Sequence, residues 1–231
     1  MTHDRRQFLS RVAAGAALGA FPLAFDAPGV LHAATLLGHA DPRRAPDDWD
    51  VTWPNRITGR YRTVFDVPEI ESGYGVWRAA LWTRQYGDIL GVEPTAMSVV
   101  LVLRHNGVAL ALNQGYWDRY DLGKEGKVTH PVTQEPTDRN PVLLSSSRGE
   151  VPAQFDEAAL DRQLARGAVA LACDLALQDV IDRVVKKSGA KPDDARREAV
   201  AALVPGVILQ PSGVFAVMRA QDAGCKYLRA S

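Results

Sequence analysis

Two short runs of consecutive apolar residues constrain what this chain can fold into more than any other feature of the sequence. They are MSVVLVL at residues 97–103 and GAVALAC at residues 167–173. A strand that is apolar at every position, and not at alternate positions, is typical of a sheet covered on both faces. We therefore expect two buried strands here, in a sheet that is flanked by helices.

The segments around these runs alternate between helical and strand-like patterns. YRTVFDV at residues 61–67 is β-prone and ends at Pro68, which predicts another strand. Apolar residues at helical spacing predict helices at 76–90, 155–166, 174–187, 193–203 and 214–223, and further short strands are expected at 207–210 and 225–228. This alternation predicts a single α/β domain with a mainly parallel sheet.

The chain divides into three parts by composition. Residues 1–37 are expected to be a signal peptide and lead-in, residues 38–57 an exposed N-terminal segment, and residues 58–231 the α/β domain. Within that domain, an apolar piece at 108–112 is expected to start a helix that continues through Tyr120. Residues 123–152 form a long stretch rich in Pro, Thr, Ser and charge, and a loop of this length is expected to serve as a lid, an interface arm or a pocket wall.

The N-terminus indicates where the protein functions. Arg5 and Arg6 precede Phe8-Leu9 and a modestly apolar run at residues 12–25, which resembles a twin-arginine export signal. The run is too short to span a bilayer permanently. The alternative is a short amphipathic helix with two solvated arginines. We expect a periplasmic protein without stable membrane insertion, and the sequence leaves open where the leader is cleaved.

Charge and cysteine content exclude several classes of function. Lys plus Arg and Asp plus Glu number 27 each, so the chain lacks the basic excess of nucleic-acid-binding proteins. Two cysteines, Cys173 and Cys225, are too few to be the disulfide scaffold of a domain of this size. They allow a single bridge, two separately buried thiols, or one reactive thiol.

Candidate functional residues follow the predicted strands, because ligands gather at the carboxyl ends of the strands in parallel sheets. The three corners are residues 104–106, 173–174 and 210–213. Cys173 lies at a strand-to-helix junction, where backbone N–H groups and the helix dipole stabilise a thiolate. The neighbouring Asp174 opposes this effect, and the alternative is that Cys173 is simply a packed small residue. Candidate ligand-binding residues are His105, Asn113, Arg139, Asn140 and Ser212.

Signals for metals and cofactors are weak. His105 and His130 have no partner at metal-ligand spacing, so no metal site is predicted. Gly73-Tyr74-Gly75 lacks the further glycine and lysine of a dinucleotide or phosphate loop, and Ser212 is not in a nucleophile elbow. No cofactor is therefore predicted.

The order of these features resembles the DsrE/DsrF-like family, and specifically its exported members with a twin-arginine leader. The resemblance covers about residues 60–229. It is carried by the buried strand ending in Arg-His, the Thr-Asp-Arg-Asn-Pro of the long loop, the strand ending in Ala-Cys, and a closing Pro-Ser-Gly-Val helix. It implies a flavodoxin-like (Rossmann-like) fold and a homo-oligomer, a trimer or hexamer. It also implies a persulfide-carrying cysteine at the position of Cys173.

Two functions from different classes follow. The first is an exported protein that binds or relays a sulfur species or another small ligand at the strand ends, through Cys173. The alternative is a non-catalytic, homo-oligomeric binding or structural subunit. The sequence leaves open whether the protein is an enzyme.

Overall fold

The structure is a computed structural model that describes residues 49–231. The predicted signal peptide and most of the predicted lead-in lie outside the described residues. No helix of residues 49–231 is long and apolar enough to cross a membrane.

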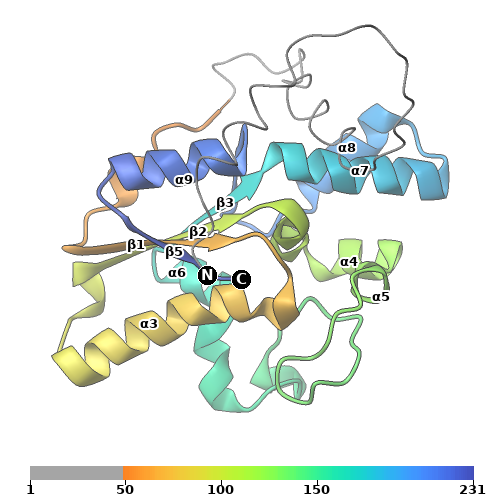
Figure 1. Ribbon diagram of the computed structural model, residues 1–231. Coiled ribbons are helices and arrows are strands. Elements are labelled where there is room, and N and C mark those ends of the chain that lie inside the picture. Colours follow the sequence, from red (N-terminus) through yellow and green to blue (C-terminus); the bar gives the residue numbers. More distant parts are fainter. Residues whose placement is uncertain (1–48) are drawn as a thin grey trace, which may run out of the picture. The chain divides into compact units, whose positions relative to one another are not determined.

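One parallel sheet of five strands organises the described residues (Figure 1). Its order is β4-β3-β2-β1-β5, so the last strand pairs with the first. The strands are β1 (Tyr61–Val67), β2 (Met97–Leu103), β3 (Val169–Cys173), β4 (Ile208–Gln210) and β5 (Lys226–Arg229). The prediction of a single α/β domain with a mainly parallel sheet flanked by helices is confirmed.

Helices connect the strands. They are α3 (Tyr74–Leu90), α4 (Gln114–Tyr120), α5 (Leu122–Glu125), α6 (Leu160–Ala165), α7 (Asp174–Ser188), α8 (Pro192–Ala201) and α9 (Gly213–Asp222). The short 3-10 helices are η2 (Trp53–Arg56), η3 (Glu71–Gly73), η4 (Pro94–Ala96), η5 (His105–Ala111), η6 (Ser146–Arg148) and η7 (Ala153–Ala158).

The sheet buries a separate core on each face. Successive side chains of a strand point to opposite faces, so Leu101 and Leu103 of β2 join one core while Val100 and Val102 join the other. The first core, the α3/α7 core, also contains buried residues of α3, α4, α7 and α8. The second, the α9 core, contains Ala216 and Ala220 of α9. In Figure 1, α9 lies above the sheet and α3 below it.

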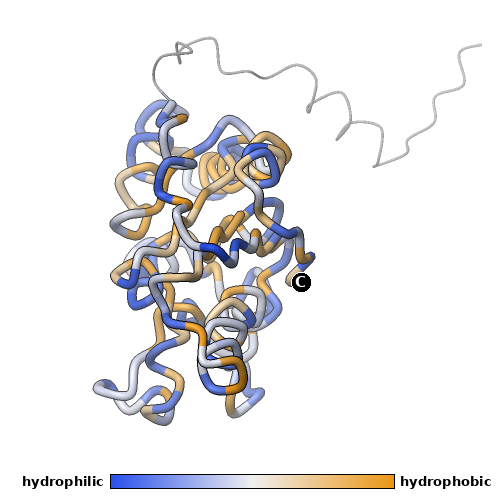
Figure 2. Tube along the Cα trace, turned by 90° about the vertical axis from the view of Figure 1, so that its left-hand side faces the viewer, coloured by the Kyte–Doolittle hydropathy of each residue, from blue (hydrophilic) through white to orange (hydrophobic). Residues whose placement is uncertain are grey.

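Burial differs between the middle and the edge of the sheet. Every residue of β3 is buried, whereas every residue of the edge strand β5 is exposed. Figure 2 shows hydrophilic and hydrophobic residues interleaved along the trace of the described residues. The continuous apolar runs of the sequence are therefore the central strands, as their composition predicts.

The described part of the segment predicted to be exposed, residues 49–57, is mostly exposed or half-buried, with two exceptions. Trp53 and Ile57 are buried, at 1% and 5% exposure, in the α9 core. The Trp53 indole donates a hydrogen bond to the side chain of Gln210, whose amide in turn donates to the carbonyl of Asp50. This segment is thus anchored at the end of β4.

The helix predicted from 108–112 through Tyr120 is wrong in its start. Residues 105–111 form the 3-10 helix η5, and the extended backbone of Leu112 and Asn113 separates it from α4. Similarly, extended backbone at Ala159 divides the helix predicted at 155–166 into η7 and α6. The predicted loop at 123–152 includes part of α5 and the 3-10 helix η6, and it buries Val142 and Leu144.

Candidate functional site

The segments that follow β3 and β4 leave the sheet toward opposite faces. After β3 the chain enters α7, which packs in the α3/α7 core, whereas after β4 it enters α9 on the opposite face. Neighbouring strands with connections on opposite faces leave a crevice between their carboxyl ends, the usual ligand position in open α/β sheets. Cys173 and Gln210 are paired in register at this point.

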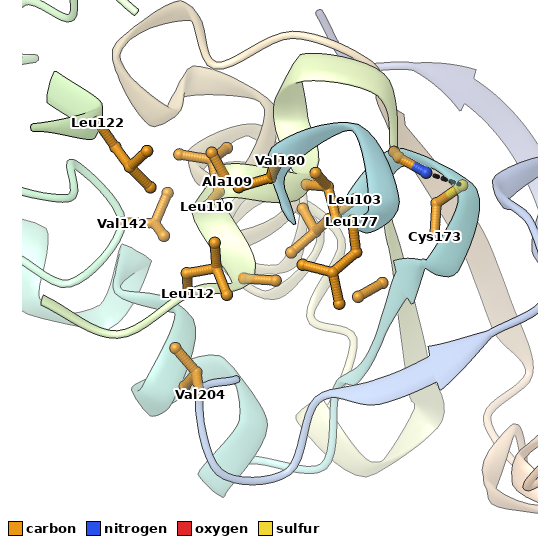
Figure 3. Close-up of a cluster of buried hydrophobic side chains, with 14 of the residues drawn as sticks. Leu103, Ala109, Leu110, Leu112, Leu122, Val142, Cys173, Leu177, Val180 and Val204 are labelled. Carbon is orange, nitrogen blue, oxygen red and sulfur yellow. Dashed lines mark hydrogen bonds between the residues drawn. The ribbon is translucent and has the colours of Figure 1, made fainter. Parts of the chain in front are cut away.

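Cys173 is surrounded by backbone donors from two helices. Its Sγ accepts a hydrogen bond from the N–H of Ala176 at 3.4 Å, as N-cap of α7, which Figure 3 shows as a dashed line. Burial, the largest cause, raises the pKa of the thiol, while hydrogen bonds from the N–H groups of Ala176, Gly213 and Leu175 lower it. The thiol is 6% exposed. The predicted stabilisation of the thiolate is present, but burial outweighs it.

The negative charge beside this thiol is paired. Asp174 accepts a hydrogen bond from the guanidinium of Arg196 on α8 at 2.8 Å, and both side chains are largely buried. Asp174 still raises the pKa of Cys173, as the sequence predicts, but as the smallest of the five causes.

Arg104 follows β2 directly and is held by a buried carboxylate. Its Nε and Nη2 donate to the two carboxylate oxygens of Asp66 at 2.6 and 2.8 Å, and Asp66 is 1% exposed. The Tyr227 hydroxyl of β5 donates to the same carboxylate at 2.8 Å. The hydrogen bond with Asp66 chiefly raises the pKa of Arg104, and the charge of Cys173 contributes to the same rise. Arg104 is therefore a cation fixed by Asp66, within electrostatic range of Cys173.

Gly213, the first residue of α9, connects the thiol and the arginine. Its N–H hydrogen-bonds to Cys173, and a Cβ built at Gly213 would lie 2.5 Å from Cδ and 2.6 Å from Cβ of Arg104. Real Cβ atoms do not approach other atoms this closely, so a side chain there would displace Arg104. The stem of Arg104 thus lies against the backbone that faces the sulfur.

Two further predicted residues lie at the same edge of the sheet. Ser212 is the N-cap of α9 and accepts a hydrogen bond from the N–H of Phe215 at 3.1 Å. His105 follows Arg104, has a left-handed backbone with φ of 50°, and pairs with Glu69 at 3.2 Å. The same glutamate accepts a hydrogen bond from Asn106. His105 is well exposed, so its ring is available to solvent at the carboxyl edge.

The other predicted binding residues support the fold. Asn113 is the N-cap of α4 and accepts from the N–H of Tyr116. Asn140 is fully buried, and its side chain donates to the carbonyls of Leu110 and Leu112. Figure 3 places Leu110 and Leu112 at a distance from Cys173 within the same cluster. Asn140 therefore anchors the long loop to η5, and a role in ligand binding remains a prediction.

Arg139 also lies in the long loop. Its guanidinium pairs with Glu150 at 2.9 Å, and its buried Nε has no hydrogen-bond partner among residues 49–231. Within residues 49–231, no three His, Cys, Asp or Glu side chains come together as a metal site would require.

The sequence places Arg104 in a candidate corner, residues 104–106, but not among the candidate ligand-binding residues, and it selects neither Asp66 nor Tyr227. Arg104 was visible as the residue that ends an apolar strand. Asp66 stands out only as a charged residue in the otherwise apolar second half of β1. Tyr227 gave no signal, because a sequence does not reveal that the last strand lies beside the first.

Both thiols are free, which excludes the single disulfide bridge that the sequence allows. Cys173 belongs to the α3/α7 core and Cys225 to the α9 core. The sheet separates these two cores, so the fold does not bring the two cysteines together as a disulfide.

Comparison with known proteins adds little to this description. No family model matches the chain, and no curated protein matches it. Among solved structures, it is similar to a protein of unknown function, MTH1491 from Methanobacterium thermoautotrophicum, with 18% sequence identity and a TM-score of 0.37. The similarity covers 73% of this chain and 98% of that one. A likeness at this level carries no argument about function, so the functional proposal rests on the site itself.

Proposed function

We propose that this chain is an exported, DsrE-like protein that accepts a sulfur atom on Cys173 and carries it as a persulfide. The observation that carries the proposal is the convergence on one sulfur atom of N–H donors from α7 and α9, with Arg104 within electrostatic range. Such donors and cations favour an anionic sulfur, which is the nucleophilic form of a thiol.

The reaction needs no reagent beyond a persulfide donor. The thiolate of Cys173 attacks the outer sulfur of a donor persulfide, R–S–SH. A sulfur–sulfur bond forms to Cys173, the donor's own sulfur–sulfur bond breaks, and the donor leaves as a thiolate that takes up the proton. A persulfide on Cys173 would be an anion stabilised by the same N–H groups.

The experiment is intact-mass analysis of the folded chain after exposure to a persulfide donor. A sulfur adduct of about 32 Da is expected on the native chain and on Cys225→Ala, and it should be lost in Cys173→Ala. Cys225 is the matched internal control, because it is equally buried. An adduct that persists in Cys173→Ala, or that forms only after unfolding, would overturn the proposal.

A non-catalytic, homo-oligomeric subunit is the second candidate. It is favoured by the 6% exposure of Cys173 and by exposed apolar residues on the outer side of α9, namely Val214 and Met218 at 69% and 55% exposure. A silent thiol together with self-association in sedimentation experiments, abolished by Met218→Lys, would support this function.

A further inference from the structure

A groove lies along the outer side of α3, away from the residues of the sulfur site. Its volume is about 790 Å³, within the range of roughly 300–1,000 Å³ typical of small-molecule sites. Its apolar lining includes Trp77, Leu81, Phe155, Val92, Pro94 and Met97. Neither Cys173 nor Arg104 belongs to the lining. This groove is therefore a second candidate site, independent of the first.

One stripe of α3 forms the length of the groove. Trp77, Leu81, Arg84 and Asp88 are spaced by four, three and four residues, which places them on one face of a helix. The stripe is apolar at its beginning and charged at its end. At the apolar end, Trp77 stacks on Phe155 of η7 with ring centroids 4.9 Å apart. A complementary ligand would be apolar at one end and charged at the other.

The charges of the groove separate into those that are paired and those that are not. Arg78 pairs with Glu71, and Arg166 pairs with Glu157. No hydrogen bond or ion pair within residues 49–231 holds Arg84 or Asp88, although both line the groove. The unpaired charges are thus one positive and one negative, one helical turn apart.

We propose that this groove binds short apolar peptides in zwitterionic form. The carboxylate of the peptide would pair with Arg84 and its ammonium group with Asp88, while its apolar side chains contact Leu81, Trp77 and Phe155. Side chains one turn apart on a helix are separated by about 5–6 Å between their Cβ atoms. The two termini of a dipeptide lie a similar distance apart, which is why a dipeptide matches both charges at once.

The experiment is calorimetric titration of the full chain with phenylalanyl-leucine and three capped forms: N-acetylated, C-amidated, and capped at both ends. The free dipeptide is expected to bind tightest, and each cap should weaken binding roughly two- to fivefold, as for exposed charge pairs. In Arg84→Gln, C-terminal amidation should no longer weaken binding, and in Asp88→Asn, N-terminal acetylation should no longer weaken binding. Phe155→Ala should weaken all four ligands equally.

The matched control is Arg183→Gln, since Arg183 is an exposed arginine on α7 that does not line the groove. It should bind all four ligands as the native chain does. Equal affinity for free and fully capped peptide would overturn the proposal. So would a loss of affinity on amidation that persists in Arg84→Gln, together with one on acetylation that persists in Asp88→Asn. Absence of binding at millimolar peptide would also overturn it. Because the readout is peptide binding, its failure leaves the sulfur chemistry of Cys173 untouched.

Discussion

The two cysteines have the same exposure, 6% each, and lie near opposite ends of the same helix. Gly213, the first residue of α9, directs its N–H at Cys173, whereas Cys225 comes shortly after α9 ends at Asp222. A helix presents partial positive charge at its N-terminus and partial negative charge at its C-terminus. The same helix therefore favours a thiolate at Cys173 and disfavours one at Cys225.

The arginines near the two thiols differ in the same way. Arg104 is held by the buried carboxylate of Asp66. Among the described residues, Arg62, near Cys225, donates to the backbone carbonyls of Gly59 and Ala223 and to no carboxylate. Burial raises the pKa of Cys225 to about 11, and the charge of Arg62 only partly offsets this. The comparison shows that equal burial does not make two thiols equivalent, because the groups that face each sulfur differ.

The largest effect is expected from Arg104→Leu. This change leaves Asp66 buried without its cation, which should lower the free energy of unfolding by about 3 kcal/mol or more. Arg62→Leu is the matched variant near the other thiol, and loss of its hydrogen bonds to carbonyls should cost about 1 kcal/mol. Urea unfolding followed by circular dichroism measures both. Equal losses would show that the Asp66 pair is no stronger than the contacts of Arg62.

Gly213→Ala should have the next largest effect. The added Cβ would meet Cδ of Arg104 at 2.5 Å, so overpacking should cost about 1–3 kcal/mol. Displacement of Arg104 and of the Gly213 N–H should also slow persulfide formation at Cys173. The rate of persulfide formation at Cys173 is compared with the rate at Cys225 in the unfolded chain.

The control is Gly87→Ala in α3, where the nearest atom to the added Cβ lies 3.7 Å away. That variant should gain up to about 1 kcal/mol, because alanine favours helix more than glycine does. If Gly213→Ala were as stable as Gly87→Ala, the close contact with Arg104 would not exist in solution.

The sequence predicts much of the structure around Cys173. The strand at 97–103 is predicted with its observed bounds because a continuous apolar run has few alternatives once it is buried on both faces. The strand at 61–67 is predicted with its observed bounds because its β-prone residues end at Pro68. The placement of Cys173 at a strand-to-helix junction also followed from the pattern. Both features depend on neighbouring residues in the chain, which is what a sequence pattern reports.

The rest depends on contacts between distant residues. Arg104 and Asp66 are 38 positions apart, and Tyr227 lies 161 positions from Asp66. Those contacts require the strand order, in which β5 pairs with β1, and local periodicity does not encode it. Asn113 and Asn140 show the same limit, because the sequence does not reveal that one caps α4 and that the other anchors the long loop to η5.

Ser212→Ala is expected to have a smaller effect. Ser212 caps α9 at the end that faces Cys173, and loss of such a cap costs about 1 kcal/mol. Ser188→Ala is the matched control at the C-terminal end of α7, where the hydroxyl donates to the carbonyl of Val184, and it should change stability by less than about 0.5 kcal/mol. Thermal unfolding of the two variants ranks them, and a harmless Ser212→Ala would mean that α9 begins without help from this hydroxyl.

The smallest effect is a pH dependence that both thiols contribute. Their pKa values are raised by burial, so each thiol binds its proton more tightly in the folded chain than in the unfolded one. As the pH rises above the ordinary thiol pKa of 9.0, the unfolded chain ionises first, and stability falls until the folded pKa is reached, about 11 for Cys225.

Between about pH 9 and 10 the free energy of unfolding should fall by no more than about 1 kcal/mol per thiol, and above this pH range the tyrosines begin to ionise. Urea midpoints across this window should fall less in Cys225→Ala than in the native chain. The N–H donors at Cys173 oppose its shift, so Cys173→Ala should reduce the fall by a smaller amount. A reversed order of the two variants would mean that burial, and not the groups facing each sulfur, decides how the thiols ionise.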